Sequence, residues 1–199
     1  MVKPGDQDTS RKDRILRAAG ELIAEVGWAN VTTRLISKRA GVNNALIHYY
    51  FGTKDDLLLE AASAVFAAEI EGSLAVIEEA ESFAEVLEGV FTWLRTVDVH
   101  SPLMVISMEA IHQAVRDERV GAWIRGVWGE YFDVLAGAVA AGQERGEIPS
   151  YVDPNGFAVM LGALIDGLSL YRLVELDFDI EKTAGVIDAL VEALTKGTQ

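Results

Sequence analysis

The side chains with the clearest chemistry lie close together between Asn43 and Lys54. An Asn amide both donates and accepts hydrogen bonds, so Asn43 and Asn44 could pair with the edge of an adenine base. The side chains in this stretch that suit phosphate oxygens are His48, Tyr49, Tyr50 and Lys54. A merely solvated face would carry mainly Lys and Arg, whereas this one carries three consecutive rings near two amides. The pattern therefore indicates a surface that meets a ligand, and nucleic acid fits it.

Two short helices joined by a turn centred on Gly41 would hold these side chains in place. Thr32 or Thr33 can cap the first helix, and Asn43 or Asn44 can cap the second. Glycine at the turn takes a positive φ without strain. The residues spaced to close a small core between the helices are Ile36, Ala40 and Ile47. On spacing alone, a helix-turn-helix and an ordinary helical hairpin fit equally well; the outward face favours the helix-turn-helix.

The rest of the chain repeats with the period of an α-helix and nowhere with the period of a strand. The first helix has Thr9 or Ser10 as its cap and can end at Gly27 in the left-handed conformation, and Thr53 caps a fourth helix. Further helices are predicted over 82–97, 103–116, 118–145, 153–175 and 179–196. The sequence thus predicts an all-α fold of about nine helices.

Other chemically able residues form no catalytic or metal-binding pattern. Asp98, His100 and Ser101 are close in sequence, but closeness in sequence is not the geometry of a catalytic triad. Glu109 and His112 make half of a carboxylate di-iron motif, and the other His residues supply no second half. The chain has no Cys, no phosphate loop and no nucleophile turn. We therefore predict no catalytic residue, metal or cofactor, and a helical enzyme is the weaker hypothesis.

The net charge of −14 is unevenly distributed. Residues 1–54 carry nine basic and five acidic residues, a net of +4, and the remaining eight basic and twenty-six acidic residues give −18. Only the basic head would approach DNA favourably. The N-terminus shows no apolar signal, and Asp166 and Arg172 interrupt the longest apolar stretch, which falls short of the ~18 to 20 residues of a spanning helix. We expect a soluble, cytoplasmic protein that binds no membrane.

The segment from Arg11 to Leu58 resembles the N-terminal DNA-binding domain of TetR-type (TetR/AcrR) transcriptional regulators. The match passes through Gly27, Thr-Thr-Arg at 32–34, Ala-Gly-Val at 40–42 and Tyr-Phe-Gly-Thr-Lys at 50–54. The resemblance implies a helix-turn-helix domain over 1–53, preceded by a short flexible tail over 1–9. It also implies a helical ligand-binding and dimerisation domain over 54–199.

The resemblance assigns DNA-contacting roles within this domain. On the first helix of the motif, Arg34 would approach bases or phosphate, and Thr33 would contact phosphate. On the second helix, Asn44, Ala45 and Tyr49 would face the major groove, beside Asn43. The residues that would contact the phosphate backbone are His48, Tyr50 and, at the start of the fourth helix, Lys54. Three positions depart from the family pattern. Ala45 and Leu46 stand where the pattern often has Gly-Thr, so Leu46 lacks the Thr hydroxyl. His48 replaces a Tyr but keeps a ring and a donor.

A second group of residues could line an apolar pocket for a small effector. Large rings and adaptable Met side chains suit such a pocket. The residues predicted to contact the effector are Trp93, Met104, Met108, His112, Trp123, Trp128 and Tyr131. The alternative is that each of them is simply part of the core.

The last two predicted helices carry continuous apolar stripes. The residues predicted to form a dimer interface are Met160, Leu161, Leu164, Leu168 and Tyr171 on one helix and Ile187, Leu190 and Leu194 on the other. Gly162 and Gly167 each cost about 1 kcal/mol of helix propensity, which favours a use in close packing. In the resembled family, two such helices pair with their symmetry mates as a four-helix bundle. The alternative is a helix pair within one monomer.

We therefore predict a homodimeric transcriptional regulator that binds a palindromic operator. The resemblance implies a repressor that responds to a small apolar or amphipathic effector. The alternatives are a DNA-binding regulator or architectural protein without an inducer, and a helical enzyme.

Overall fold

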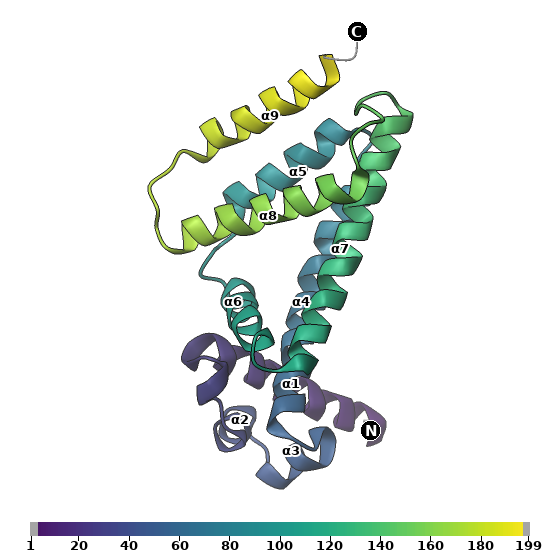
Figure 1. Ribbon diagram of the computed structural model, residues 1–199. Coiled ribbons are helices and arrows are strands. Elements are labelled where there is room, and N and C mark those ends of the chain that lie inside the picture. The colour runs from purple at the N-terminus through teal and green to yellow at the C-terminus, as the bar shows by residue number, and fades with distance from the viewer. Residues whose placement is uncertain (1–3, 197–199) are drawn as a thin grey trace. The chain divides into compact units, whose positions relative to one another are not determined.

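The computed structural model describes residues 4–196, and over this range the chain forms nine α-helices and one short 3-10 helix (Figure 1). In chain order these are α1 (Pro4–Val26), η1 (Trp28–Asn30), α2 (Thr33–Ala40), α3 (Asn44–Phe51), α4 (Lys54–Glu79), α5 (Phe83–Thr96), α6 (Pro102–Ala114), α7 (Glu118–Glu144), α8 (Pro154–Leu173) and α9 (Ile180–Lys196). The predicted all-α class is confirmed.

Helix α1 differs from the prediction at both ends. It begins at Pro4, earlier than the expected cap at Thr9 or Ser10, and enters the range expected to be a flexible tail. Proline is favoured at the first helical position because its missing N–H has no partner there in any case. At the other end Gly27 has the expected positive φ of 80°, but its ψ of 150° lies outside the left-handed helical region.

The described chain divides into two compact units, each made of two segments. Unit 1 contains the residues up to 70 together with 100–125, and unit 2 contains 71–99 together with 126–196. Helices α4 and α7 each begin in unit 1 and end in unit 2. Helix α6 therefore belongs to the same compact unit as the N-terminal helices, although it lies far beyond Lys54 in sequence.

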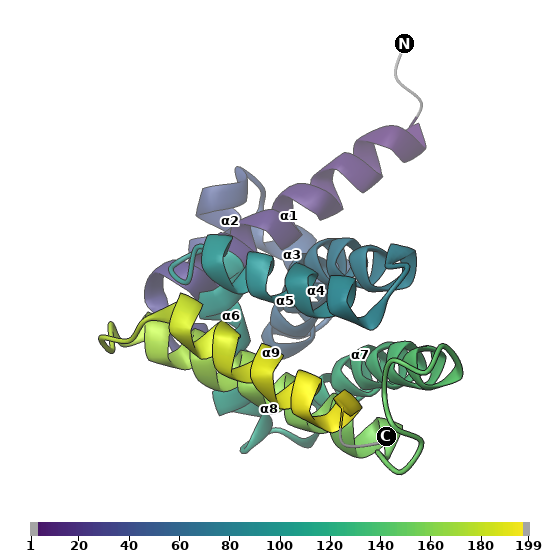
Figure 2. The same ribbon diagram turned by 90° about the horizontal axis from the view of Figure 1, so that it is seen from above.

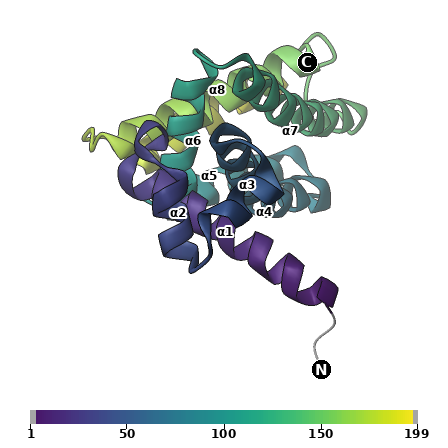
Figure 3. The same cartoon turned by 90° about the horizontal axis from the view of Figure 1, so that it is seen from below.

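Unit 1 is built on α1, which packs against both α2 and α6, and the view from below shows α2 and α3 beside it (Figure 3). The predicted small core between the two short helices is confirmed, because Ile36, Ala40 and Ile47 are all buried. Helix α1 approaches its neighbours closely at Gly20, where an added Cβ would lie 3.4 Å from Val65 of α4.

Unit 2 contains α5, α8 and α9, which run side by side (Figures 1 and 2). Phe83 of α5 packs edge-on against Phe157 of α8, with 5.5 Å between the ring centroids. The expected close packing occurs at Gly162, where an added Cβ would lie 2.4 Å from the Phe132 ring of α7. It does not occur at Gly167, where an added Cβ would have no heavy atom of another described element within 4 Å.

Helix α8 is long and apolar enough to cross a membrane by length and composition, which the sequence prediction did not anticipate. It nevertheless supplies buried core residues to unit 2, namely Phe157, Ala158, Leu161, Ile165 and Leu168. A helix that packs in the core of a water-soluble protein passes the same test.

Candidate nucleic-acid interface

The turn between α2 and α3 is held by local caps. The Oγ1 of Thr32 accepts the Leu35 N–H at 3.2 Å, which identifies Thr32 as the cap of α2. Helix α2 ends at Gly41, with φ 65° and ψ 40°, the left-handed conformation that glycine adopts without strain. Asn43 then caps α3, because its Oδ1 accepts the Ala45 N–H at 2.9 Å. Helices α2 and α3 thus form a helix-turn-helix with an ordered turn.

Helix α3 has one buried face and one exposed face. Ile47 and Phe51 are buried, whereas Ala45, His48 and Tyr49 are exposed. Tyr49 is 77% exposed, unusually open for a large ring. Its ring meets that of half-buried Tyr50 edge-on, at a centroid distance of 5.2 Å. The helix therefore presents aromatic and polar side chains outward on a rigid support.

The two Asn residues are placed differently. Asn43 is exposed, but its Oδ1 already accepts the Ala45 N–H as the helix cap. A base that bonded to this oxygen would have to share it with that N–H. Asn44 is half-buried, and its Oδ1 has no hydrogen-bond partner within the described part of the chain. A buried acceptor without a partner costs free energy, which a donor on an incoming ligand would recover.

The end of α3 places two further predicted contacts. Nδ1 of His48 lies 3.2 Å from the carbonyl oxygen of Gly52, so its Nε2 is the nitrogen left for a phosphate. Lys54 opens α4, and its Nζ lies 3.9 Å from the Asp55 carboxylate, too far for a strong ion pair. Both side chains can turn to an external phosphate.

Helix α2 carries both free and engaged cations. Arg34 is exposed with no ion pair to any described residue, and Thr33 is half-buried. Arg39 binds Glu25 at 2.7 and 2.8 Å and Glu21 at 3.3 Å, and these hydrogen bonds raise the pKa of Arg39 above its usual range. Arg39 thus links α2 to α1 through these ion pairs. Its positive charge is therefore less available to DNA than that of Arg34, which has no such partner among the described residues.

The comparisons with known proteins agree with this geometry. Residues 15–67 match the model of the bacterial regulatory proteins of the tetR family, and residues 80–196 match the model of the BetI-type transcriptional repressor C-terminal domain. The chain belongs to the TetR family. It is thus a DNA-binding transcriptional regulator and not an enzyme, as predicted.

Several similar transcriptional regulators cover most of the chain. An uncharacterised HTH-type regulator of Mycobacterium tuberculosis H37Rv is 27% identical over 92% of both chains. The repressor NicS of Pseudomonas putida KT2440 is 28% identical over 73% of this chain and 68% of its own. A putative regulator from Saccharomonospora viridis, solved in complex with choline, has a TM-score of 0.78 at 24% identity, covering 92% of this chain and 96% of its own. This last likeness shows the fold alone.

The predicted effector-binding residues of this TetR-family chain fall into two groups. Unit 1 contains Met104, Met108, His112 and Trp123, and unit 2 contains Trp93, Trp128 and Tyr131. Met104 is buried, and Trp123 packs edge-on against Phe66 at 5.0 Å, as core residues do. His112 is exposed, with its Nε2 2.7 Å from the Arg116 guanidinium. The unit 2 residues are all half-buried.

The predicted dimer residues lie on different faces of α8 and α9. Met160, Tyr171 and Leu190 are large, apolar and exposed. Leu161 and Leu168 are buried in the core of unit 2, so a partner could not reach them, and we correct the predicted interface by removing both. The half-buried residues Leu164 and Ile187 pack against that core, and the side chain of Leu194 lies outside the described residues.

Two acidic residues have long-range partners that the sequence does not predict. Glu109 completes half of a metal motif in the sequence, yet its carboxylate accepts the backbone N–H of Trp28. Asp166 interrupts an apolar stretch in the sequence, yet its charge, after burial, contributes to the raised pKa of Tyr131. An acid within an apolar helical stretch is the one signal that could have drawn attention to Asp166.

Proposed function

We propose that this TetR-family protein is a cytoplasmic, homodimeric repressor that binds a palindromic operator through α2 and α3 and is released by a small effector. We propose Lys54, the first residue of α4, as the boundary between the DNA-binding domain and the effector-binding and dimerisation domain. The single observation that supports sequence-specific DNA binding is the exposed face of α3. Tyr49 on this face is 77% exposed, while Ile47 and Phe51 on the opposite face are buried.

DNA geometry supports the dimer. One short recognition helix reads only a few base pairs, whereas a two-fold dimer reads two half-sites at a fixed spacing. The exposed apolar residues of α8 and α9 offer a surface for it, and they are Val159, Met160, Leu170, Tyr171, Val186 and Leu190. Large exposed apolar patches mark interaction surfaces.

The DNA-binding proposal is tested by fluorescence anisotropy with palindromic duplexes taken from the DNA that flanks the gene. Phosphate contacts release counterions, so affinity should fall linearly on a log scale as salt rises. A scrambled duplex serves as the control and should bind at least about a thousandfold more weakly at physiological salt. Equal binding of the two duplexes would contradict the proposal.

We further propose that the effector is a small organic cation of the quaternary ammonium class. The support is the choline bound by the Saccharomonospora viridis regulator and the BetI-type match over 80–196. Aromatic rings with a carboxylate nearby recognise such cations through cation–π attraction and charge. Unit 2 contains aromatic rings of this kind. Trp93 and Tyr131 pack on its core, and Trp128 precedes Tyr131 on α7.

Asp166 of α8 would supply the counter-charge. Burial raises the pKa of its carboxyl group, although the residue as a whole remains exposed. Burial, and next the charge of Asp166, raise the pKa of Tyr131 to about 12. A bound cation would favour the ionised carboxylate and so offset its desolvation.

Isothermal titration with choline tests this site. Asp166→Asn should weaken choline binding several-fold, whereas Asp133→Asn, an exposed acid elsewhere on α7, should not. Choline should also release the operator from the wild-type protein. If choline does not bind, the proposed effector class is wrong, and the DNA-binding proposal is unaffected.

A further inference from the structure

A carboxylate of α6 holds the link between α1 and α2. Oε2 of Glu109 accepts the backbone N–H of Trp28 at 2.9 Å, across 81 residues of sequence. Trp28 is the first residue of η1, and the first N–H groups of a helix have no partner within it. Glu109 therefore caps η1 from another element, and a hydrogen bond to a charged acceptor is stronger than a neutral one.

Gly27 completes the contact. Its positive φ of 80° favours a residue without a side chain, and an added Cβ would lie 3.5 Å from Oε1 of Glu109. Both residues that anchor the link, Trp28 and Val31, are buried. The link from α1 into the helix-turn-helix is thus held at the Glu109 carboxylate and cannot shift without breaking that hydrogen bond.

A second polar contact joins the first turn of α4, which follows the helix-turn-helix, to the start of α7. Arg119 Nη1 lies 2.7 Å from Asp56 Oδ1, across 63 residues, and Asp56 also accepts the Thr53 hydroxyl at 2.5 Å. Asp117 holds the same guanidinium at 3.2 Å, and this contact lowers the pKa of Asp117. The Arg119–Asp56 pair is half-exposed, so alone it contributes little.

The same contacts account for the half metal motif noted in the sequence. Glu109 is engaged with Trp28, and His112 Nε2 lies 2.7 Å from the Arg116 guanidinium. No cluster of three metal-ligating side chains occurs among the residues that the structure describes. Glu109 therefore has a structural partner on the DNA-binding side of unit 1.

We propose that Glu109 is a positioning residue for DNA binding. It fixes the orientation of α2 and α3 on α6 and so sets operator affinity without touching the DNA, with the Arg119–Asp56 pair as the weaker second support. The inference rests on the proposed operator binding. A dimer that reads two half-sites must hold both recognition helices at a fixed spacing, and loosening one end adds an ordering cost to binding.

The test compares Glu109→Ala with Glu109→Gln in operator titrations over a range of salt. Glu109→Ala should weaken operator binding by about tenfold, the scale of one hydrogen bond to a charged group. Its salt dependence should match the wild type, because no phosphate contact is lost. Glu109→Gln should restore most of the affinity, since its amide oxygen can accept the same N–H. Arg125→Ala, which removes an exposed ion pair with Glu118, is the matched control and should bind as the wild type does.

Hydrogen exchange at the Trp28 amide gives a readout that needs no DNA. Exchange should be faster in Glu109→Ala than in the wild type and slow again in Glu109→Gln, with unchanged circular dichroism. Wild-type operator affinity in Glu109→Ala, or an equal loss in both variants, would overturn the inference. A wild-type protein that does not bind the palindrome would instead contradict the proposed function, while the exchange measurement still reports on the contact.

Discussion

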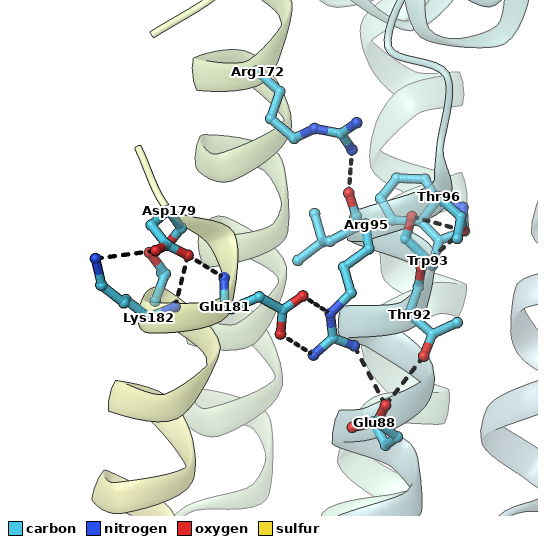
Figure 4. Close-up of polar contacts among 11 residues, drawn as sticks. Glu88, Thr92, Trp93, Arg95, Thr96, Arg172, Asp179, Glu181 and Lys182 are labelled. Carbon is cyan, nitrogen blue, oxygen red and sulfur yellow. Dashed lines mark hydrogen bonds and ion pairs between the residues drawn. The ribbon is translucent and has the colours of Figure 1, made fainter. Parts of the chain in front are cut away.

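Arg95 of α5 forms a bidentate ion pair with Glu181 of α9, across 86 residues of sequence (Figure 4). The two bonds measure 2.6 and 3.1 Å, and Glu88 binds the same guanidinium at 3.3 Å. The hydrogen bond to Glu181 raises the pKa of Arg95. Close by, Arg172 of α8 donates to the carbonyl oxygen of Leu94, one of the last carbonyls of α5, which would otherwise lack a helical partner. The N-terminal end of α9 is thus tied to α5.

Because α9 is part of the proposed dimer surface, this ion pair should influence dimerisation. Arg95→Ala should raise the dimer dissociation constant by roughly two- to fivefold, since exposed ion pairs are weak. Lys182→Ala is the control, because the partner of Lys182 among the described residues is nearby Asp179 and the Lys182 side chain is 85% exposed. Sedimentation equilibrium measures both. High salt should reduce the difference between Arg95→Ala and the wild type, and a difference that persists in 1 M NaCl would argue against a charge effect.

Gly162 should tolerate no side chain. In Gly162→Ala the new Cβ would meet the Phe132 ring at 2.4 Å, so the ring or α8 must move, at a cost of about 1 to 3 kcal/mol in the free energy of unfolding. Gly137 lies at an exposed position of α7, and a Cβ added there would meet no described atom within 4 Å. Gly137→Ala should therefore stabilise by about 0.5 to 1 kcal/mol through helix propensity. Urea denaturation compares the two, and similar values for both variants would contradict the packing argument.

Glu147 makes stability depend on pH. Its Oε2 accepts the Phe83 N–H at the start of α5 at 2.8 Å, and Arg145 binds both carboxylate oxygens. The hydrogen bond from Arg145 is the main cause of its lowered pKa. A lowered folded-state pKa contributes stability above the unfolded value of about 4.5, and that contribution is lost as pH falls through the folded value.

Glu147→Gln should therefore show a shallower loss of stability below about pH 4.5 than the wild type does. At neutral pH it should be slightly less stable, because a neutral acceptor replaces a charged one. Glu144→Gln, an exposed neighbour on α7 with no capping contact among the described residues, should follow the wild-type curve. Urea midpoints measured between pH 3 and pH 7 decide this, and parallel curves for all three proteins would show that Glu147 does not contribute.

Truncation of Tyr49 and truncation of Lys54 should weaken DNA binding in different ways. Tyr49→Ala should cost about 1 to 3 kcal/mol in operator binding and little in non-specific binding, because the exposed ring would meet base edges. Lys54→Ala should weaken both kinds of binding and reduce the salt slope by about one, as the loss of one phosphate contact predicts. Anisotropy titrations with operator and scrambled duplexes separate the two roles. Equal losses on both duplexes for both variants would contradict the assignment.

The sequence predicted local structure better than long-range contacts, for a physical reason. Caps and turns depend on neighbouring residues, so Gly41 and the cap of α3 could be foreseen, although Asn43 and Asn44 could not be separated. The contacts of Glu109 with Trp28 and of Arg95 with Glu181 join residues more than 80 positions apart. No local pattern marks such pairs.

The same limit applies to helix faces and to free charges. Leu161 and Met160 are adjacent on one apolar stripe, yet only the packing of unit 2 decides that Leu161 is buried and Met160 exposed. Arg39 is one of the cations of α2, but Glu21 and Glu25 of α1 bind its guanidinium. Tertiary partners, which composition does not reveal, decide both outcomes.

Met160 provides the sharpest test of the dimer surface. It is 59% exposed on α8, beside the buried core face of the same helix. Met160→Asp places a charge where the partner would pack, and burying an unpaired carboxylate costs several kcal/mol. The dimer dissociation constant should therefore rise by at least about a hundredfold.

Val115→Asp is the matched control, because Val115 is 83% exposed at the end of α6 and lies outside the proposed surface. Sedimentation velocity should show a monomer for Met160→Asp and a dimer for Val115→Asp. Operator affinity should fall along with dimerisation, because a single recognition helix reads only one half-site. A Met160→Asp protein that remains dimeric would place the interface elsewhere.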